Sequence, residues 1–90
     1  MTEDRLIRIK RLAMRSMRRG IKEMDLILSA YADTHLAAMS EAELDAYEAL
    51  LEENDQDLYQ WVSGQIQAPD EHAALIARIA EGAHGLTRPA

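Results

Sequence analysis

The 90-residue sequence contains no cysteine and no phenylalanine, and it has only two prolines and four glycines. Without cysteine there is no disulfide scaffold, no thiolate metal site and no cysteine nucleophile. No apolar run approaches the roughly 20 residues that span a bilayer, and none resembles the core of a secretory signal. We therefore expect one small cytoplasmic domain, residues 1–83, with a mobile tail at 84–90 and no stable membrane insertion.

Positive charge is confined to the start of the chain. Residues 1–22 hold eight basic residues against two acidic ones, whereas the remaining 68 residues hold 14 acidic residues against two basic ones. Such asymmetry shapes encounters with partners more than it shapes the fold. The basic segment includes Glu3 and Asp4 and runs straight into a central motif. We therefore expect mature structure here and not a mitochondrial transit peptide.

Two helices are predicted on either side of Gly20. The apolar spacing indicates a basic amphipathic helix over residues 3–18, which Gly20 is expected to end as a left-handed C-cap. Its inner face is expected to comprise Leu6, Ile9, Ala13 and Met17. Its basic face is expected to comprise Arg8, Arg11, Arg15, Arg18 and Lys22. A second helix is predicted over residues 21–35, with an inner face of Met24, Ile27, Leu28 and Tyr31.

Three further helices are predicted in the acidic part of the chain. The first starts at a capping box, Ser40 to Glu43. It is expected to bury Leu44, Tyr47 and Leu51 and to show water Glu41, Asp45, Glu48 and Glu52. The next is capped by Asn54 or Asp55 and turns inward Leu58, Trp61, Val62 and Ile66.

The last predicted helix starts near Pro69 and ends at Gly82 or Gly85. Its inner face is expected to comprise Leu75, Ile76, Ile79 and Ala83. No stretch of the sequence alternates with a strand period. The prediction is an all-α fold, a single compact bundle of about five short helices.

The acidic and histidine residues do not predict an active site or a metal site. Three carboxylates lie along the second predicted helix, where carboxylates are ordinarily solvated: Glu23, Asp25 and Asp33. The three histidines lie far apart in the sequence, and none has a partner four residues away as paired zinc ligands do. They are His35, His72 and His84. We expect Trp61 in the core, and we expect no catalytic, metal-binding or cofactor-binding residue.

The basic helix leaves several interpretations open. An arginine-rich helix in a compact helical frame is typical of DNA readers, but the acidic remainder of the chain would repel phosphates. Adsorption to a membrane surface meets the same objection less severely. A merely solvated charged face is the simplest interpretation of the composition. A hydrolase would require an activity that is lost in Glu23→Gln.

The stretch RSMRRGIKEMD, residues 15–25, resembles the Arg-Gly-x-x-Glu signature of the SdhE-type FAD assembly factors of succinate dehydrogenase. The matching residues are Arg19, Gly20, Glu23 and Asp25, followed by Leu26 and Leu28. A second block is similar to another segment of that family. Its matching residues are Leu50, Leu51, Glu52, Asp57, Leu58, Tyr59 and Trp61. The resemblance covers about residues 5–80. The sequence departs from the family pattern at Met14, Met17, Ser29 and Gln56.

The resemblance implies a five-helix factor that binds the flavoprotein subunit of succinate dehydrogenase, and in some bacteria that of fumarate reductase. Such a factor promotes covalent attachment of FAD, which the partner holds, and adds no catalytic groups. We expect a monomer that binds no nucleic acid. The predicted partner-binding residues are Arg15, Arg18, Arg19, Gly20, Glu23 and Asp25. The alternative is an antitoxin-like protein-binding module or a small basic-helix nucleic-acid binder.

Overall fold

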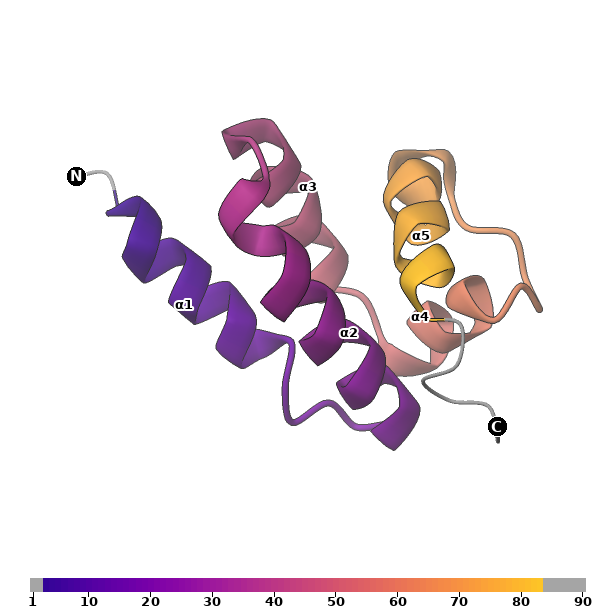
Figure 1. Ribbon diagram of the computed structural model, residues 1–90. Coiled ribbons are helices and arrows are strands. Elements are labelled where there is room, and N and C mark those ends of the chain that lie inside the picture. The colour runs from indigo at the N-terminus through magenta and orange to yellow at the C-terminus, as the bar shows by residue number, and fades with distance from the viewer. Residues whose placement is uncertain (1–2, 84–90) are drawn as a thin grey trace.

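The computed structural model describes residues 3–83, in which five α-helices and one short 3-10 helix follow one another (Figure 1). They are α1 (Arg5–Arg15), α2 (Lys22–His35), η1 (Leu36–Ala38), α3 (Glu41–Leu51), α4 (Asp55–Val62) and α5 (Asp70–Gly82). Residues 3–83 contain no strand, so the predicted all-α fold is confirmed. Within the same residues, no helix has the length and apolar character needed to cross a membrane. The tail predicted at 84–90 lies outside the described residues.

Helix α2 lies at the centre of the bundle. It contacts α1 on one side and α4 and α5 on the other, as Figure 1 shows. The side chains with the least exposure come from all five helices and from η1. They include Leu12, Met24, Leu28, Leu36, Leu44, Tyr47, Leu50, Leu58 and Ile79. These residues form one connected core, and the α1–α2 loop lies at one end of the bundle, as Figure 1 shows.

Tyr47 is the largest of the fully buried side chains. Its hydroxyl lies 2.6 Å from the hydroxyl of Ser16, which donates a hydrogen bond to the carbonyl oxygen of Leu12 at 2.8 Å. Ser16 and Tyr47 are both fully buried. Burial raises the pKa of Tyr47 to about 12, so its hydroxyl stays neutral at physiological pH. The hydroxyl pair therefore fixes the C-terminal end of α1 against α3 without leaving an unsatisfied polar group.

The predicted capping box at the start of α3 is confirmed. The backbone N–H of Glu43 donates to Ser40 Oγ at 3.1 Å, and the Ser40 N–H donates to Glu43 Oε1 at 2.8 Å. Asn54 also caps α4, accepting from the N–H of Gln56 at 2.8 Å. Helix α5 begins after Pro69 and ends at Gly82. These local signals were predictable because they depend on residues only two to four positions apart.

Glu43 gives the fold a specific sensitivity to acid. The hydrogen bond from the Ser40 amide, with a further bond from Arg78, lowers the pKa of Glu43 from 4.5 to about 2. Because the folded pKa lies below the unfolded one, Glu43 stabilises the fold fully above pH 4.5, and this stabilisation is lost as the pH falls toward 2. We expect thermal melts at pH 6, 4 and 3 to show a smaller loss of stability on acidification for Glu43→Gln than for wild type. Glu81→Gln, an exposed change on α5, should behave as wild type, and equal pH dependence of all three proteins would contradict this assignment.

Two predictions about the first helix are wrong. Leu6 and Met17 were assigned to its inner face, but both are exposed, and the residue that α1 buries fully is Leu12. The helix also ends at Arg15, five residues before the glycine that was predicted to cap it. Among the described residues the left-handed backbone occurs at Arg18, with φ 57°, and at Gly64, with φ 83°, and not at Gly20. In the fourth helix, Ile66 was also placed inward, but it lies beyond the end of α4 and is exposed.

Candidate functional site

The loop between α1 and α2, residues 16–21, carries the Arg-Gly motif and has an unusual backbone. Arg18 adopts a left-handed conformation at φ 57°, which costs a non-glycine residue roughly 1 kcal/mol. The backbone N–H of Arg18 donates to Asp25 Oδ2 at 3.2 Å, and the same carboxylate accepts from Ser29 Oγ at 3.2 Å. Asp25, in the first turn of α2, therefore holds the loop from one side.

Asp55, the first residue of α4, holds the loop from the other side. Its Oδ1 accepts from Arg19 Nε at 2.7 Å, and its Oδ2 accepts from the backbone N–H of Gly20 at 2.6 Å. The Arg19 guanidinium also donates to the carbonyl oxygens of Arg15, at 3.0 Å, and Leu51, at 3.3 Å. The side chains of Arg19 and Asp55 are only 12% and 19% exposed. Arg19 and Asp55 therefore tie the loop to α1, α3 and α4, and we call this pair the Arg19–Asp55 bracket.

A side chain at Gly20 would crowd the carboxylate of Asp55. A Cβ atom built on Gly20 would lie 3.2 Å from Asp55 Oδ2, which is tighter than an ordinary contact. The residue is exposed on its other side. Its lack of a side chain therefore matters first for the close approach of Asp55, the first residue of α4.

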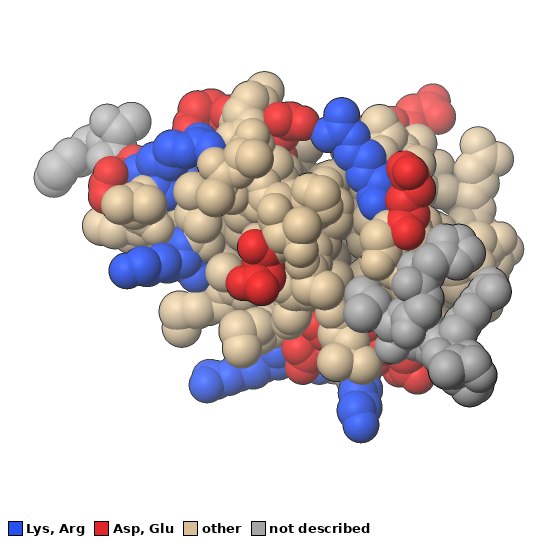
Figure 2. Space-filling view, in the orientation of Figure 1, with Lys and Arg blue, Asp and Glu red and all other residues tan. Residues whose placement is uncertain are grey.

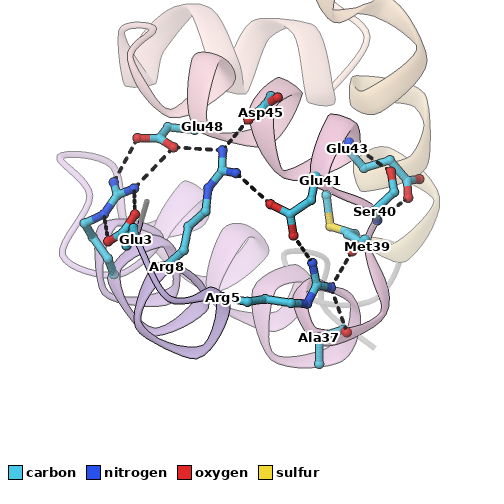
Figure 3. Close-up of polar contacts among 11 residues, drawn as sticks. Glu3, Arg5, Arg8, Ala37, Met39, Ser40, Glu41, Glu43, Asp45 and Glu48 are labelled. Atoms are coloured by element: carbon cyan, nitrogen blue, oxygen red, sulfur yellow. Dashed lines mark hydrogen bonds and ion pairs between the residues drawn. The ribbon is translucent and has the colours of Figure 1, made fainter. Parts of the chain in front are cut away.

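The arginines of α1 face α3 and pair with its acidic residues, as Figure 3 shows. Arg8 lies between three carboxylates, with its nitrogens 2.6 Å from Asp45, 3.1 Å from Glu48 and 3.2 Å from Glu41. Arg11 pairs with Glu48 at 2.8 Å and also with Glu3 at 2.9 Å. Further pairs join Arg5 to Glu41 and Arg15 to Glu52. We call this set of pairs between α1 and α3 the α1–α3 ion ladder.

The ladder shifts the titration of its members in the directions that ion pairs require. The hydrogen bond from Arg11 holds the pKa of Glu48 below its usual value, and it does the same for Glu3. The carboxylate of Asp45 raises the pKa of Arg8, and those of Glu3 and Glu48 raise that of Arg11. Glu41, Asp45 and Glu52 are exposed, as predicted, and Glu48 is half-buried. The sequence did not reveal that all four also pair with the basic helix.

The six residues predicted to bind a partner divide into two groups. Three of them make contacts within the molecule. Arg15 pairs with Glu52, and Arg19 pairs with Asp55. Asp25 accepts a hydrogen bond from the Arg18 amide. Arg18 and Glu23 are exposed, and so is Gly20, which lies between them in the sequence. Their role in binding stays a prediction. The geometry shows a held loop with Arg18 exposed on it and Glu23 exposed in the first turn of α2.

Sequence reasoning missed Asp55 as a functional residue and considered it only as a helix cap. It also gave no sign that Glu53, Glu71 and His72 would lie together near the start of α5. One ligand atom each of Glu53, Glu71 and His72 lies within 4.8 Å of the others, a spacing that could hold a metal ion. His72 Nε2 is already 2.9 Å from Glu53 Oε2, and its ring lies 5.8 Å from that of Trp61. This group therefore also serves as a link between the α3–α4 turn and α5.

Comparison with known proteins decides the family. Residues 10–83 match the model of the family Sdh5, described as the flavinator of succinate dehydrogenase. The chain belongs to this family. The family resemblance stated from the two sequence blocks is confirmed. The matched range includes the motif loop, the Arg19–Asp55 bracket and all of α2 to α5.

Similar proteins occur among fungi under the name succinate dehydrogenase assembly factor 2, mitochondrial. The protein of Candida glabrata is 53% identical over 53 residues, which cover 59% of this chain and 35% of that protein. Those of Aspergillus terreus and Meyerozyma guilliermondii are each 44% identical, over 77% and 68% of this chain and 23% and 45% of their own lengths. The chain thus spans less than half the length of each of these relatives. The predicted cytoplasmic location is wrong by this comparison, because the relatives are named mitochondrial, which points to that compartment.

Proposed function

We propose that this chain is an assembly factor that binds the flavoprotein subunit of succinate dehydrogenase and promotes covalent attachment of FAD to a histidine of that subunit. The observation that carries the proposal is the match of residues 10–83 to a family described as a flavinator. In this proposal the chain holds no cofactor and contributes no catalytic group, because FAD stays on the partner. The relatives' names mention succinate dehydrogenase alone, so the proposal does not extend to fumarate reductase.

The held loop supports a mechanism based on docking. Arg18 and Glu23 present opposite charges to the partner, and Gly20 leaves the surface near them without a side chain. A loop that is already fixed by Asp25 and Asp55 loses little entropy when it binds. Docking then holds the flavoprotein with its histidine against the flavin. Proximity and orientation of this kind can supply roughly 7–11 kcal/mol of a reaction barrier.

Nucleic-acid binding has less support from the ion pairs. Arg8, Arg11 and Arg15 each have carboxylate partners on α3, so phosphates would have to displace those partners. A protein that binds duplex DNA through several phosphates also shows a steep dependence on salt. An affinity for duplex DNA that falls steeply between 50 and 200 mM salt would favour this alternative.

The proposal predicts a loss of covalent flavin when the factor is removed. Flavin fluorescence of the denatured flavoprotein subunit, measured in a gel, should fall strongly in cells that lack this protein and return when it is supplied. Arg18→Ala and Glu23→Ala should each restore the signal only in part, because both side chains are exposed and neither makes an ion pair within residues 3–83.

Glu81→Ala is the matched control for Glu23→Ala. Glu81 is also an exposed glutamate, but it lies near His35, at the opposite end of α2 from the motif loop. Far-UV circular dichroism would establish that all variants fold. Unchanged fluorescence in cells without the protein would refute the proposed function. Full restoration by both motif variants would leave the function standing and remove the motif loop from its mechanism.

A further inference from the structure

Helix α1 has three sides, of which two are occupied within the molecule. One side buries Leu12 against the core, and a second directs its arginines at α3. The third side carries Leu6, Ile7 and Met14, around Lys10, and at about 3.6 residues per turn these positions fall within a sector of roughly 100°. Met17 continues this side into the motif loop. We call the four apolar residues Leu6, Ile7, Met14 and Met17 the α1 apolar face.

The α1 apolar face is far more exposed than core residues of its type. The four side chains are between 50% and 67% exposed. Two hollows adjoin them. One is a wide, open depression on the surface of α1 itself, lined by Ile7, Lys10, Arg11, Met14 and Arg15. The other, of about 380 Å³, lies between α1 and α2 and is lined by Ala13, Met17, Ser29, Ala30, Ala32 and Asp33. The apolar surface therefore has relief into which a partner's side chains can fit.

Among the residues that line the two hollows, Lys10, Arg11 and Arg15 are basic and Asp33 is acidic. Lys10, Arg18 and Lys22 are exposed, and their side chains make no ion pair within residues 3–83. Figure 2 shows tan side chains spread over α1 and α2, with blue side chains along the left and lower margins and a red side chain within the tan area. Clustered apolar side chains at the surface, methionines in particular, are typical of protein-binding sites. A partner for this surface should be apolar at its centre and acidic at its edge.

We propose that the α1 apolar face is a second contact surface for the flavoprotein subunit, continuous with the motif loop, and that it meets an apolar patch bordered by acidic residues. The inference rests on the proposed function and adds a surface to it. A second copy of this chain is a poorer occupant, because an isologous contact would bring Lys10, Arg18 and Lys22 toward their own equivalents. An anionic membrane is poorer too, since the whole chain carries a net charge of -6.

The test uses the full 90-residue chain and the FAD-free flavoprotein subunit. The double variant Ile7→Gln/Met14→Gln removes apolar surface while keeping good helix formers on α1. Its matched control is Ile66→Gln, because Ile66 is also 50% exposed but lies between α4 and α5. We expect biolayer interferometry to give an affinity roughly tenfold or more weaker for the double variant, and an unchanged affinity for Ile66→Gln. Lys10→Glu should weaken binding most at low salt.

The outcomes separate this inference from the proposed function. If wild type binds and restores covalent flavin, and the folded double variant does both equally well, the inference is wrong and the proposed function stands. If wild type itself neither binds nor restores flavin, the proposed function has failed. Sedimentation velocity that reveals a wild-type dimer lost in the double variant would assign the face to a second copy. Cosedimentation with phosphatidylglycerol vesicles that the double variant abolishes would assign it to a membrane. Either result overturns the inference.

Discussion

Asp55→Ala is expected to lower the free energy of unfolding by about 3 kcal/mol and to abolish the support of flavinylation, although Asp55 lies 35 residues from Gly20. The variant removes two of the acceptors that hold the motif loop, those for Arg19 Nε and for the Gly20 amide. It also leaves a largely buried guanidinium without its carboxylate. Hydrogen bonds to charged groups contribute about 1.5–3 kcal/mol each, and partial exposure of the pair reduces their sum. Urea denaturation and in-gel flavin fluorescence would measure the two effects.

Asp57→Ala is the control for this prediction. Asp57 is an exposed aspartate in the same first turn of α4, so it has a similar relation to the helix dipole but no contact with the loop. Its loss should cost less than about 1 kcal/mol. Asp55→Asn keeps an acceptor for the Gly20 amide and removes the charge that faces Arg19, so we expect an intermediate loss of stability. Equal stability and activity of the Asp55 and Asp57 alanine variants would show that the bracket does not fix the loop.

The Arg19–Asp55 bracket also affects how the effects of a substitution at Gly20 should be interpreted. The sequence predicted Gly20 as a partner-binding residue. In the structure the Cβ would first meet Asp55, so a bulky residue at this position disturbs the loop as well as its outer surface. Gly20→Val is therefore expected to lose both stability and binding. Arg18→Ala and Glu23→Ala are the cleaner tests of contact with the partner, because the bonds that hold the loop do not use those side chains.

The sequence predicted those parts of the fold that depend on neighbouring residues. The capping box at Ser40 and the Asn54 cap needed only two to three residues each, and the inner residues of α2 repeat along one helix face. Of the four residues predicted to form the inner face of α1, Ile9 and Ala13 pack against the core, but Leu6 and Met17, which match the same helical repeat, are exposed. A helix with more than one apolar stripe does not reveal which stripe faces the core. That choice depends on where α2 and α3 lie.

The candidate site was predictable only where one segment contains it. The motif residues 19–25 could be found because they are contiguous in the sequence. The partners of the motif and of the basic helix lie 32 to 40 residues away, on α3 and α4, and no local pattern joins them. The composition therefore suggested a free basic surface, whereas most of those charges are paired. Within the part of the chain that the structure describes, the apolar side of α1 stays exposed, and the side chains of Lys10, Arg18 and Lys22 make no ion pair.

Glu48→Arg is expected to produce the second large effect, by loosening α1 from α3. Glu48 receives Arg8 at 3.1 Å and Arg11 at 2.8 Å, and Arg15 lies 3.9 Å away. A fourth cation at this position converts three attractions into repulsions. Exposed pairs contribute about 0.2–1 kcal/mol each, so the expected loss is about 2 kcal/mol. For a domain of this size that lowers the melting temperature by roughly 10 °C.

Charge exchange and salt give this prediction its controls. Arg11→Glu in the Glu48→Arg background restores one opposed pair and should recover part of the melting temperature. The destabilisation should also shrink in 1 M salt, where exposed charges are screened over about 3 Å. If the reversal melts as wild type at low salt, the α1–α3 ion ladder does not anchor α1. If it melts early but the exchange recovers nothing, the loss comes from packing and not from charge. Because the α1 apolar face is carried by this helix, recovery of stability should also recover binding of the flavoprotein.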